Sequence, residues 1–137
     1  MKKVIIFTDG GARGNPGPAA IGVQFLDEEK EVLGELSETI GEATNNVAEY
    51  SAVKRALEHL PQIFEDTKAV QVAFFLDSQL VERQLKGEYK IKDQNLKEYA
   101  DAIKVLEREC ASVVYNHVPR NENKEADRLV NEALDAE

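Results

Sequence analysis

The sequence predicts a single α/β domain in which a five-stranded mixed sheet is flanked by helices. Two apolar runs, at 4–7 and 70–76, are rich in β-branched and aromatic residues, which is typical of central strands buried on both faces. Helical patterns occupy most of the second half of the chain. The resulting order of elements, βββαβααβα, predicts a mixed sheet covered by helices. A length of 137 residues corresponds to one domain, spanning 1–137.

Five segments carry strand patterns. The expected strands are Val4–Phe7, Ala20–Leu26, Val32–Ile40, Val70–Leu76 and Val113–Val118. The first stops at Thr8-Asp9 and a glycine-rich turn. A polar turn separates the second from the third, which partly alternates, so the first three strands predict an antiparallel meander. The fourth is the second strongly apolar run, and we expect the fourth and fifth strands to add in parallel.

Four segments carry helical patterns. We expect helices from Asn45 or Asn46 to about Leu60, from Ser78 to Gly87, over Asn95–Glu109, and from Asn123 to the C-terminus. Either asparagine can cap the first helix, and Pro61 is expected to end it. Ser78 caps the second, and Gly87 suits its C-terminal end. The last two helices are amphipathic, so each has one face to pack on the sheet or on another helix.

Composition and charge exclude several classes of protein. Apolar residues at 42% and charged residues at 31% rule out disordered and fibrous chains. A net charge of −9 argues against a general nucleic-acid coat, but carboxylates that bind metal ions also count as negative charge. The apolar run near the start is too short for a membrane span or a signal peptide, and the single cysteine, Cys110, cannot form an internal disulfide. We therefore expect a cytoplasmic protein without membrane contact.

Two aspartates directly follow the strongest strand patterns. Asp9 and Asp77 each come after an apolar run, where an unpaired buried carboxylate costs several kcal/mol. Each alone is readily a turn former or a helix cap. If the two strands are parallel neighbours, however, both carboxylates converge at one edge of the sheet, where open sheets place their ligand sites.

Glu49, Asp127 and His117 are the remaining candidates. Glu49 falls in the middle of the apolar stripe of its helix, so it pairs with a cation, points into a site, or complements the helix dipole in the first turn. Asp127 lies at the border of the apolar stripe of the last helix. His117 ends a strand ten residues earlier. Taken singly, Asp127 is an ordinary helix-surface residue and His117 an ordinary structural one.

One explanation accounts for all four carboxylates together. Carboxylates can lie close to one another only where positive charge neutralises them, and no lysine or arginine accompanies all four positions. Oxygen ligands without cysteine or a histidine pair suit Mg²⁺ or Mn²⁺ and not zinc. Two such ions about 4 Å apart hold the attacking water and the leaving oxygen of a phosphodiester. A nearby histidine would help to move protons or to release product.

The same residues occur in four motifs that follow one another along the chain. They are Thr8-Asp9-Gly10-Gly11 with Gly14-Asn15-Pro16-Gly17-Pro18, then Thr44-Asn45-Asn46-Val47-Ala48-Glu49, then Asp77-Ser78-Gln79, and finally His117 with Asn123-Lys124-Glu125-Ala126-Asp127-Arg128-Leu129. In this order, over essentially the whole chain, they resemble type 1 ribonuclease H. The resemblance implies the ribonuclease H-like fold and a Mg²⁺-dependent endonuclease. Such an enzyme cuts the RNA strand of an RNA/DNA hybrid and leaves 5′-phosphate and 3′-hydroxyl ends.

The resemblance also implies a role for each site residue. Four carboxylates would be the ligands of two Mg²⁺ ions, with Mn²⁺ as a substitute: Asp9, Glu49, Asp77 and Asp127. Asp9 would bridge both ions, and His117 would assist proton transfer or product release. Four side chains match positions that contact the hybrid: Asn15, Asn45, Asn46 and Gln79. Amide groups there can read 2′-hydroxyls across a shallow minor groove, which separates RNA from DNA without reading sequence.

The sequence departs from the family in its basic contacts. The basic protrusion of some bacterial members is shortened or absent, and the stretch around Gly87–Asp93 is what could replace it. We assign Lys86 and Lys90 to substrate binding, with Lys92 beside them. Weaker substrate affinity and lower processivity are expected, without loss of the chemistry.

Three other functions are compatible with parts of the pattern. A non-enzymatic hybrid- or RNA-binding module on the same fold would be marked by loss of a carboxylate, and all four are present. A DNA nuclease or recombinase would need further DNA-binding segments. In a purely structural domain, the placement of the four acids would be accidental. We expect a monomer that acts on an RNA/DNA hybrid without an obligate protein partner, since no apolar stripe is left over once the core is assigned.

Overall fold

The computed structural model describes residues 2–137, which form a five-stranded sheet in the order β3-β2-β1-β4-β5. The strands are β1 (Lys2–Ala12), β2 (Gly17–Leu26), β3 (Val32–Ala43), β4 (Val70–Leu76) and β5 (Ser112–His117). β1, β2 and β3 pair as an antiparallel meander, whereas β4 pairs in parallel with both β1 and β5. The predicted fold class, with its antiparallel and parallel halves, is confirmed.

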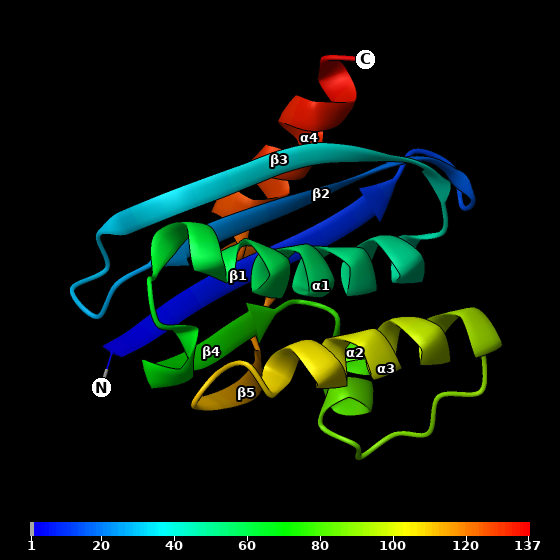
Figure 1. Ribbon diagram of the computed structural model, residues 1–137. Coiled ribbons are helices and arrows are strands. Elements are labelled where there is room, and N and C mark those ends of the chain that lie inside the picture. Colours follow the sequence, from blue (N-terminus) through cyan, green and yellow to red (C-terminus); the bar gives the residue numbers. More distant parts are fainter. Residues whose placement is uncertain (1) are drawn as a thin grey trace.

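Helices cover both faces of this sheet. They are α1 (Asn45–Ile63), α2 (Gln79–Leu85), α3 (Gln94–Glu107) and α4 (Lys124–Asp135), with single 3₁₀ turns at Thr67–Ala69 and Arg120–Glu122. Figure 1 shows α1 on one face of the sheet with α3 beside it, and α4 on the opposite face. The main core lies under α1, where Ile6, Phe74 and Tyr50 are fully buried. None of the helices in residues 2–137 combines the length and apolar character that a membrane crossing requires.

Both ends of α1 differ from the prediction. Thr44 is the cap, because its side chain accepts a hydrogen bond from the Val47 N–H at 3.2 Å, and neither predicted asparagine does this. The helix also continues through Pro61 to Ile63. Pro61 is tolerated in the last turn, and the extra residues are held there because Ile63 packs against the core. The predicted Ser78 cap of α2 is confirmed, with Oγ accepting from the Val81 N–H at 3.3 Å.

The first strand does not stop at Asp9. Pairing with β4 ends at Thr8, but pairing with β2 continues as far as Ala12. Asp9 therefore lies inside β1, opposite Gly22, with β2 on one side and the end of β4 on the other. Asp77, by contrast, directly follows β4 as predicted. The two aspartates meet because β4 ends where β1 continues.

Candidate active site

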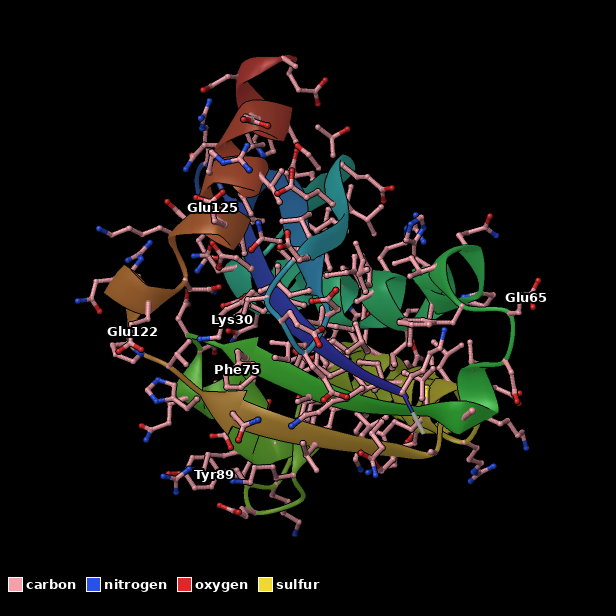
Figure 2. The ribbon with its side chains drawn as sticks, turned by 90° about the vertical axis from the view of Figure 1, so that its left-hand side faces the viewer. Lys30, Glu65, Phe75, Tyr89, Glu122 and Glu125 are labelled. Carbon is pink, nitrogen blue, oxygen red and sulfur yellow. The ribbon has the colours of Figure 1, made fainter. Side chains whose placement is uncertain are left out.

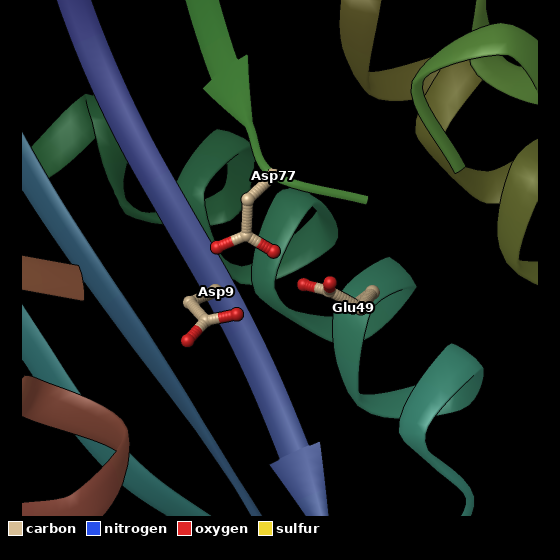
Figure 3. A group of neighbouring side chains, drawn as sticks. All are labelled: Asp9, Glu49 and Asp77. Atoms are coloured by element: carbon tan, nitrogen blue, oxygen red, sulfur yellow. The ribbon is translucent and has the colours of Figure 1, made fainter. Parts of the chain in front are cut away.

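Three of the four predicted carboxylates converge in the structure. Carboxylate oxygens of Asp9, Glu49 and Asp77 all lie within 4.8 Å of one another. Figure 3 shows them reaching the same point from β1, from the first turns of α1 and from the segment after β4. Asp9 and Glu49 are only 8% and 7% exposed, so the oxygens are largely withdrawn from water.

Glu49 reaches this point because Gly10 lets α1 approach β1 closely. A Cβ at position 10 would lie 2.2 Å from the Ala48 carbonyl carbon, far inside van der Waals contact. At this separation the Glu49 Oε1 accepts a hydrogen bond from the Gly10 N–H at 2.9 Å. The predicted position of Glu49 on the buried face of its helix is confirmed, and the missing side chain of Gly10 sets its height above the sheet.

Gly22 has the corresponding role on the opposite face. A Cβ at position 22 would lie 2.1 Å from the Ala126 carbonyl oxygen and 2.9 Å from the Val130 nitrogen, so α4 packs directly on the β2 backbone. This contact places the half-buried Asp127 near Asp9, which is paired with Gly22. Asp127 lies outside the group of three, yet its charge acts on Asp9.

The clustered charges perturb one another. Burial raises the pKa of Asp9 to about 7, and the charges of Asp77 and Asp127 add to the shift. The Gly10 N–H and the Arg120 charge oppose it only in part. Burial also raises the pKa of Glu49 well above its usual value, again with help from Asp9 and Asp77. An all-oxygen cluster that resists ionisation on its own fits a hard divalent cation such as Mg²⁺ or Mn²⁺, which would stabilise the charged forms.

Comparison with known proteins places this arrangement in a family. The profile of the family described as "Reverse transcriptase-like" matches residues 7–133. A solved structure of LC11-RNase H1, isolated from compost by a metagenomic approach, is 50% identical with a TM-score of 0.94, over 99% of this chain and 98% of that one. The chain belongs to the type 1 ribonuclease H family. The same LC11 enzyme has also been solved in complex with an RNA/DNA hybrid, and that structure is 48% identical with a TM-score of 0.93 over 97% of both chains.

Two curated relatives of this chain are longer proteins. Ribonuclease HI of Halobacterium salinarum is 40% identical over 97% of this chain and 65% of its own length. A bifunctional protein of Mycobacterium tuberculosis is 40% identical over 98% of this chain. The chain spans only 36% of the length of that mycobacterial protein.

His117 lies at the same edge of the ribonuclease H sheet as the carboxylates. It is the last residue of β5 and is paired in register with Leu76, the residue before Asp77. Its side chain is exposed to solvent. A histidine at this position can exchange protons with water while it stays within one strand spacing of the end of β4.

The asparagines predicted to contact substrate connect the loop after β1 to the start of α1. Asn45 Oδ1 accepts a hydrogen bond from the Ala12 N–H at 2.9 Å, and Asn15 Oδ1 accepts one from the Asn45 N–H at 3.0 Å. Both side chains are exposed, whereas Asn46 is half-buried. Gln79 is exposed as the first residue of α2. All four amides therefore lie within six residues, along the chain, of one of the three clustered carboxylates.

The basic loop, residues 86–92, carries the two lysines that were assigned to substrate binding, and their surroundings differ. Lys86 pairs with Glu82 at 2.9 Å and with Glu88 at 3.5 Å, so much of its charge is neutralised within the chain. Lys90 is exposed. Figure 2 shows Tyr89 of this loop well away from Glu122, in the 3₁₀ turn before α4, and from Glu125, in the first turn of α4. The loop directly follows α2, the helix that begins two residues after Asp77.

Sequence reasoning used Asn123 only as the start of a helix, but the structure places its side chain in the site. Its Nδ2 donates to Asp77 Oδ2 and to the Thr8 carbonyl oxygen, both at 2.9 Å, and the residue is 1% exposed. The one available indication was its position, four residues before Asp127 in the same motif. Gly22 was also missed, because nothing in the local sequence reveals which helix packs on it.

Proposed function

We propose that this chain is a metal-dependent endonuclease that hydrolyses the RNA strand of RNA/DNA hybrids and leaves 5′-phosphate and 3′-hydroxyl ends. One observation carries the proposal: three carboxylates from separate elements place their oxygens within 4.8 Å of one another in a largely buried position. The 50% identity to a solved ribonuclease H1 over almost the full chain supports the same activity.

The carboxylates are the proposed ligands of two divalent cations. Asp9 is the carboxylate whose pKa is raised by the charges of both Asp77 and Asp127, which suits a ligand shared by two ions. Glu49 and Asp77 would complete one side of the site and Asp127 the other. When bound, the ions would activate a water molecule and stabilise the charge that develops on the scissile phosphate.

The remaining residues supply proton exchange and substrate contacts. His117, exposed beside the end of β4, would move a proton to or from the leaving group or help product depart. Asn15, Asn45, Asn46 and Gln79 are proposed to contact the hybrid by amide hydrogen bonds. The hybrid complex of the 48%-identical LC11 enzyme supports this substrate. Of the two predicted lysines, Lys90 is the one whose charge is available to a phosphate, because Lys86 is ion-paired.

Cleavage of an end-labelled RNA/DNA hybrid tests the proposal. The native chain, the Asp9→Asn variant and an Asp101→Asn control would be compared in Mg²⁺, in Mn²⁺ and in EDTA. Asp101 is an exposed aspartate of α3, so the control makes the same chemical change outside the site. We expect metal-dependent cutting of the RNA strand alone by the native chain and the control, and none by Asp9→Asn.

Other results would redirect the assignment. Binding of the hybrid without cleavage in either metal would indicate a non-catalytic module. Cleavage by the Asp9→Asn variant would contradict the assignment of Asp9 as a metal ligand. Analysis of the RNA fragments with a phosphatase and a 3′-end ligase would check the end chemistry separately.

We also propose that residues 1–137 act as one cytoplasmic domain that is monomeric and needs no protein partner. The support is that the sheet, α1 and α3 enclose one continuous core and that the chain has a single cysteine. Sedimentation equilibrium of the isolated chain tests the oligomeric part, and a mass of twice 15.3 kDa would contradict it.

A further inference from the structure

Asn123 does not make the capping hydrogen bond that is usual for a residue at the start of a helix. It occupies the N-cap of α4, where an asparagine side chain normally accepts a hydrogen bond from the first turn of the helix. Here it makes no such bond, and its side chain turns toward the sheet. The amide instead contacts a carbonyl oxygen of β1 and the carboxylate of Asp77, residues that are 115 and 46 positions away along the chain.

The two bonds use the whole donor capacity of the amide. Nδ2 carries two hydrogens, and its two acceptors, the Thr8 oxygen and Asp77 Oδ2, both lie at 2.9 Å. The reversed orientation of the amide would point an oxygen at two other oxygens, so the contacts also fix which end is nitrogen. Among residues 2–137 no group donates to the buried Oδ1. The side chain thus leaves an acceptor unsatisfied while both donors are directed at the site.

This side chain joins three of the four segments that carry the site carboxylates. Thr8 is the last residue of β1 that pairs with β4, and it directly precedes Asp9. Asp77 follows the last residue of β4, beyond the sheet pairing that would hold it. Asn123 itself begins α4, which carries Asp127 one turn later. A single amide therefore connects Asp9, Asp77 and Asp127 through their backbones or side chains.

We infer that Asn123 is a positioning residue, which holds one oxygen of Asp77 so that the other faces Asp9 and Glu49 as a metal ligand. This inference rests on the proposed metal site. Hydrogen bonds that orient a ligating carboxylate typically change metal affinity or activity by about 10–100-fold when they are removed. The role is exerted through Asp77, because the Nδ2 group that Asn123 directs at this carboxylate is a hydrogen-bond donor and cannot itself bind a cation.

Calorimetric titration with Mn²⁺ alone, without nucleic acid, tests the inference. Asn123→Ala is expected to raise the Kd for Mn²⁺ by about 10–100-fold. Asn116→Ala is the matched control, because Asn116 Nδ2 also donates to a strand carbonyl, that of Phe74, at 3.1 Å but has no carboxylate partner. In an Asp77→Asn background, Asn123→Ala should have no further effect on Mn²⁺ binding, because the ligand that it orients is already lost.

Three results would overturn the inference, and they differ in whether they also contradict the proposed metal site. If folded Asn123→Ala binds Mn²⁺ as tightly as the native chain, only the positioning role fails. If Asn123→Ala weakens binding equally with and without the Asp77 carboxylate, the effect is structural and does not pass through Asp77. If the native chain binds no Mn²⁺, both the proposed metal site and the role of Asn123 are wrong.

A measurement on the native chain covers the case in which Asn123→Ala does not fold. The ¹⁵N–¹H signals of the Asn123 side-chain amide should exchange slowly with water, because both hydrogens are bonded and the residue is 1% exposed. They should also shift when Mg²⁺ is added, whereas the Asn116 side-chain signals stay in place. Asn123 signals that do not move at saturating Mg²⁺ would contradict the role.

Discussion

At the scale of single residues, the site is defined by acids that the fold prevents from separating. Asp9 and Glu49 are almost fully buried and face further negative charge, so each is harder to ionise than a free carboxylic acid. Such strain persists only because the surrounding fold holds the side chains in place. The same property that suits the cluster to cations lowers the stability of the chain when no cation is supplied.

The pH dependence of stability without metal measures this strain. The pKa of Asp9 is about 7 in the folded chain against 3.8 for an unperturbed aspartate. Between these values the folded chain holds a proton that the unfolded chain releases, so the free energy of unfolding falls as pH rises from about 4 to 7. The loss from this group is at most about 4 kcal/mol.

The substitution Asp9→Asn removes that loss. In urea unfolding with EDTA, we expect the variant to gain stability relative to the native chain at pH 7.5, and to gain much less at pH 4.5. The exposed Asp101→Asn control should follow the native chain at both pH values. Identical pH dependence of Asp9→Asn and the native chain would show that Asp9 titrates normally.

At the scale of elements, two glycines decide how near the helices come to the sheet. Gly10 admits α1 and Gly22 admits α4, from opposite faces and at neighbouring positions of β1 and β2. Because each helix carries one of the acids, the two close contacts fix the depth of Glu49 and of Asp127. The geometry of the site thus depends on the absence of a Cβ at Gly10 and Gly22 as well as on the carboxylates themselves.

Gly22→Ala is expected to disturb both stability and activity. The added methyl group would overlap the Ala126 carbonyl oxygen at 2.1 Å, and overpacking of this kind costs roughly 1–3 kcal/mol. The displacement of α4 would carry Asp127 away from Asp9, so hybrid cleavage should fall by more than the loss of folded protein explains. Urea unfolding and single-turnover cleavage measure the two effects.

Gly34→Ala is the control for this substitution. It lies in β3, where a Cβ would make an ordinary contact of 3.6 Å with Ile63 Cδ1. We expect nearly native stability and cleavage. Equal losses in Gly22→Ala and Gly34→Ala would mean that any strand glycine is sensitive, and that close approach of α4 is not the cause.

The basic loop supplies a second test at this scale. Each phosphate contact that a cation makes steepens the dependence of binding on salt, with a slope change of about 1 per lysine removed. Lys90→Ala should therefore reduce the salt slope of hybrid binding more than Lys86→Ala, since Lys86 is held by Glu82 and Glu88. Binding would be measured in the Asp9→Asn background to prevent cleavage. A triple Lys86, Lys90 and Lys92 to Ala variant with an unchanged slope would exclude the loop from substrate binding.

At the scale of the whole molecule, folding and ion binding are coupled. The carboxylates come from β1, α1 and the segment after β4, and they are close only when the sheet and helices are assembled. The unfolded chain has no equivalent site. A cation that binds the folded chain therefore stabilises all of it and not only the loop that it touches.

Thermal unfolding with added cation should report this coupling. At a metal concentration 100 times the Kd, one bound ion stabilises a protein by about 2.7 kcal/mol. We expect the Tm of the native chain to rise with MnCl₂, while the Tm of Asp9→Asn stays nearly constant. Because that variant starts from a less repulsive cluster, the two Tm values should converge as Mn²⁺ is added. Equal shifts in both chains would indicate ion binding elsewhere on the acidic surface.

Local sequence patterns were sufficient to predict which side chains belong to strands, to buried helix faces and to strand ends. Glu49 on the apolar stripe of α1 and Asp77 after β4 were predictable because periodicity and apolar runs are local properties of the chain. The antiparallel meander and the two parallel strands were predictable from the element order and the family resemblance. The boundaries were less certain, since Asp9 lies inside β1 only because β2 continues beside it after β4 has ended.

Which groups come into contact across the fold could be learned only from the packed structure. The contact of Gly22 with Ala126, the bond from Asn123 to Asp77 and the neutralisation of Lys86 by Glu82 all depend on distances between separate turns, strands and helices. The first two join residues far apart in sequence, and the third depends on how a short helix is buried. The local sequence pattern predicts which face of a helix or strand a side chain lies on. Its distance to a partner depends on how closely the helices and strands pack against one another.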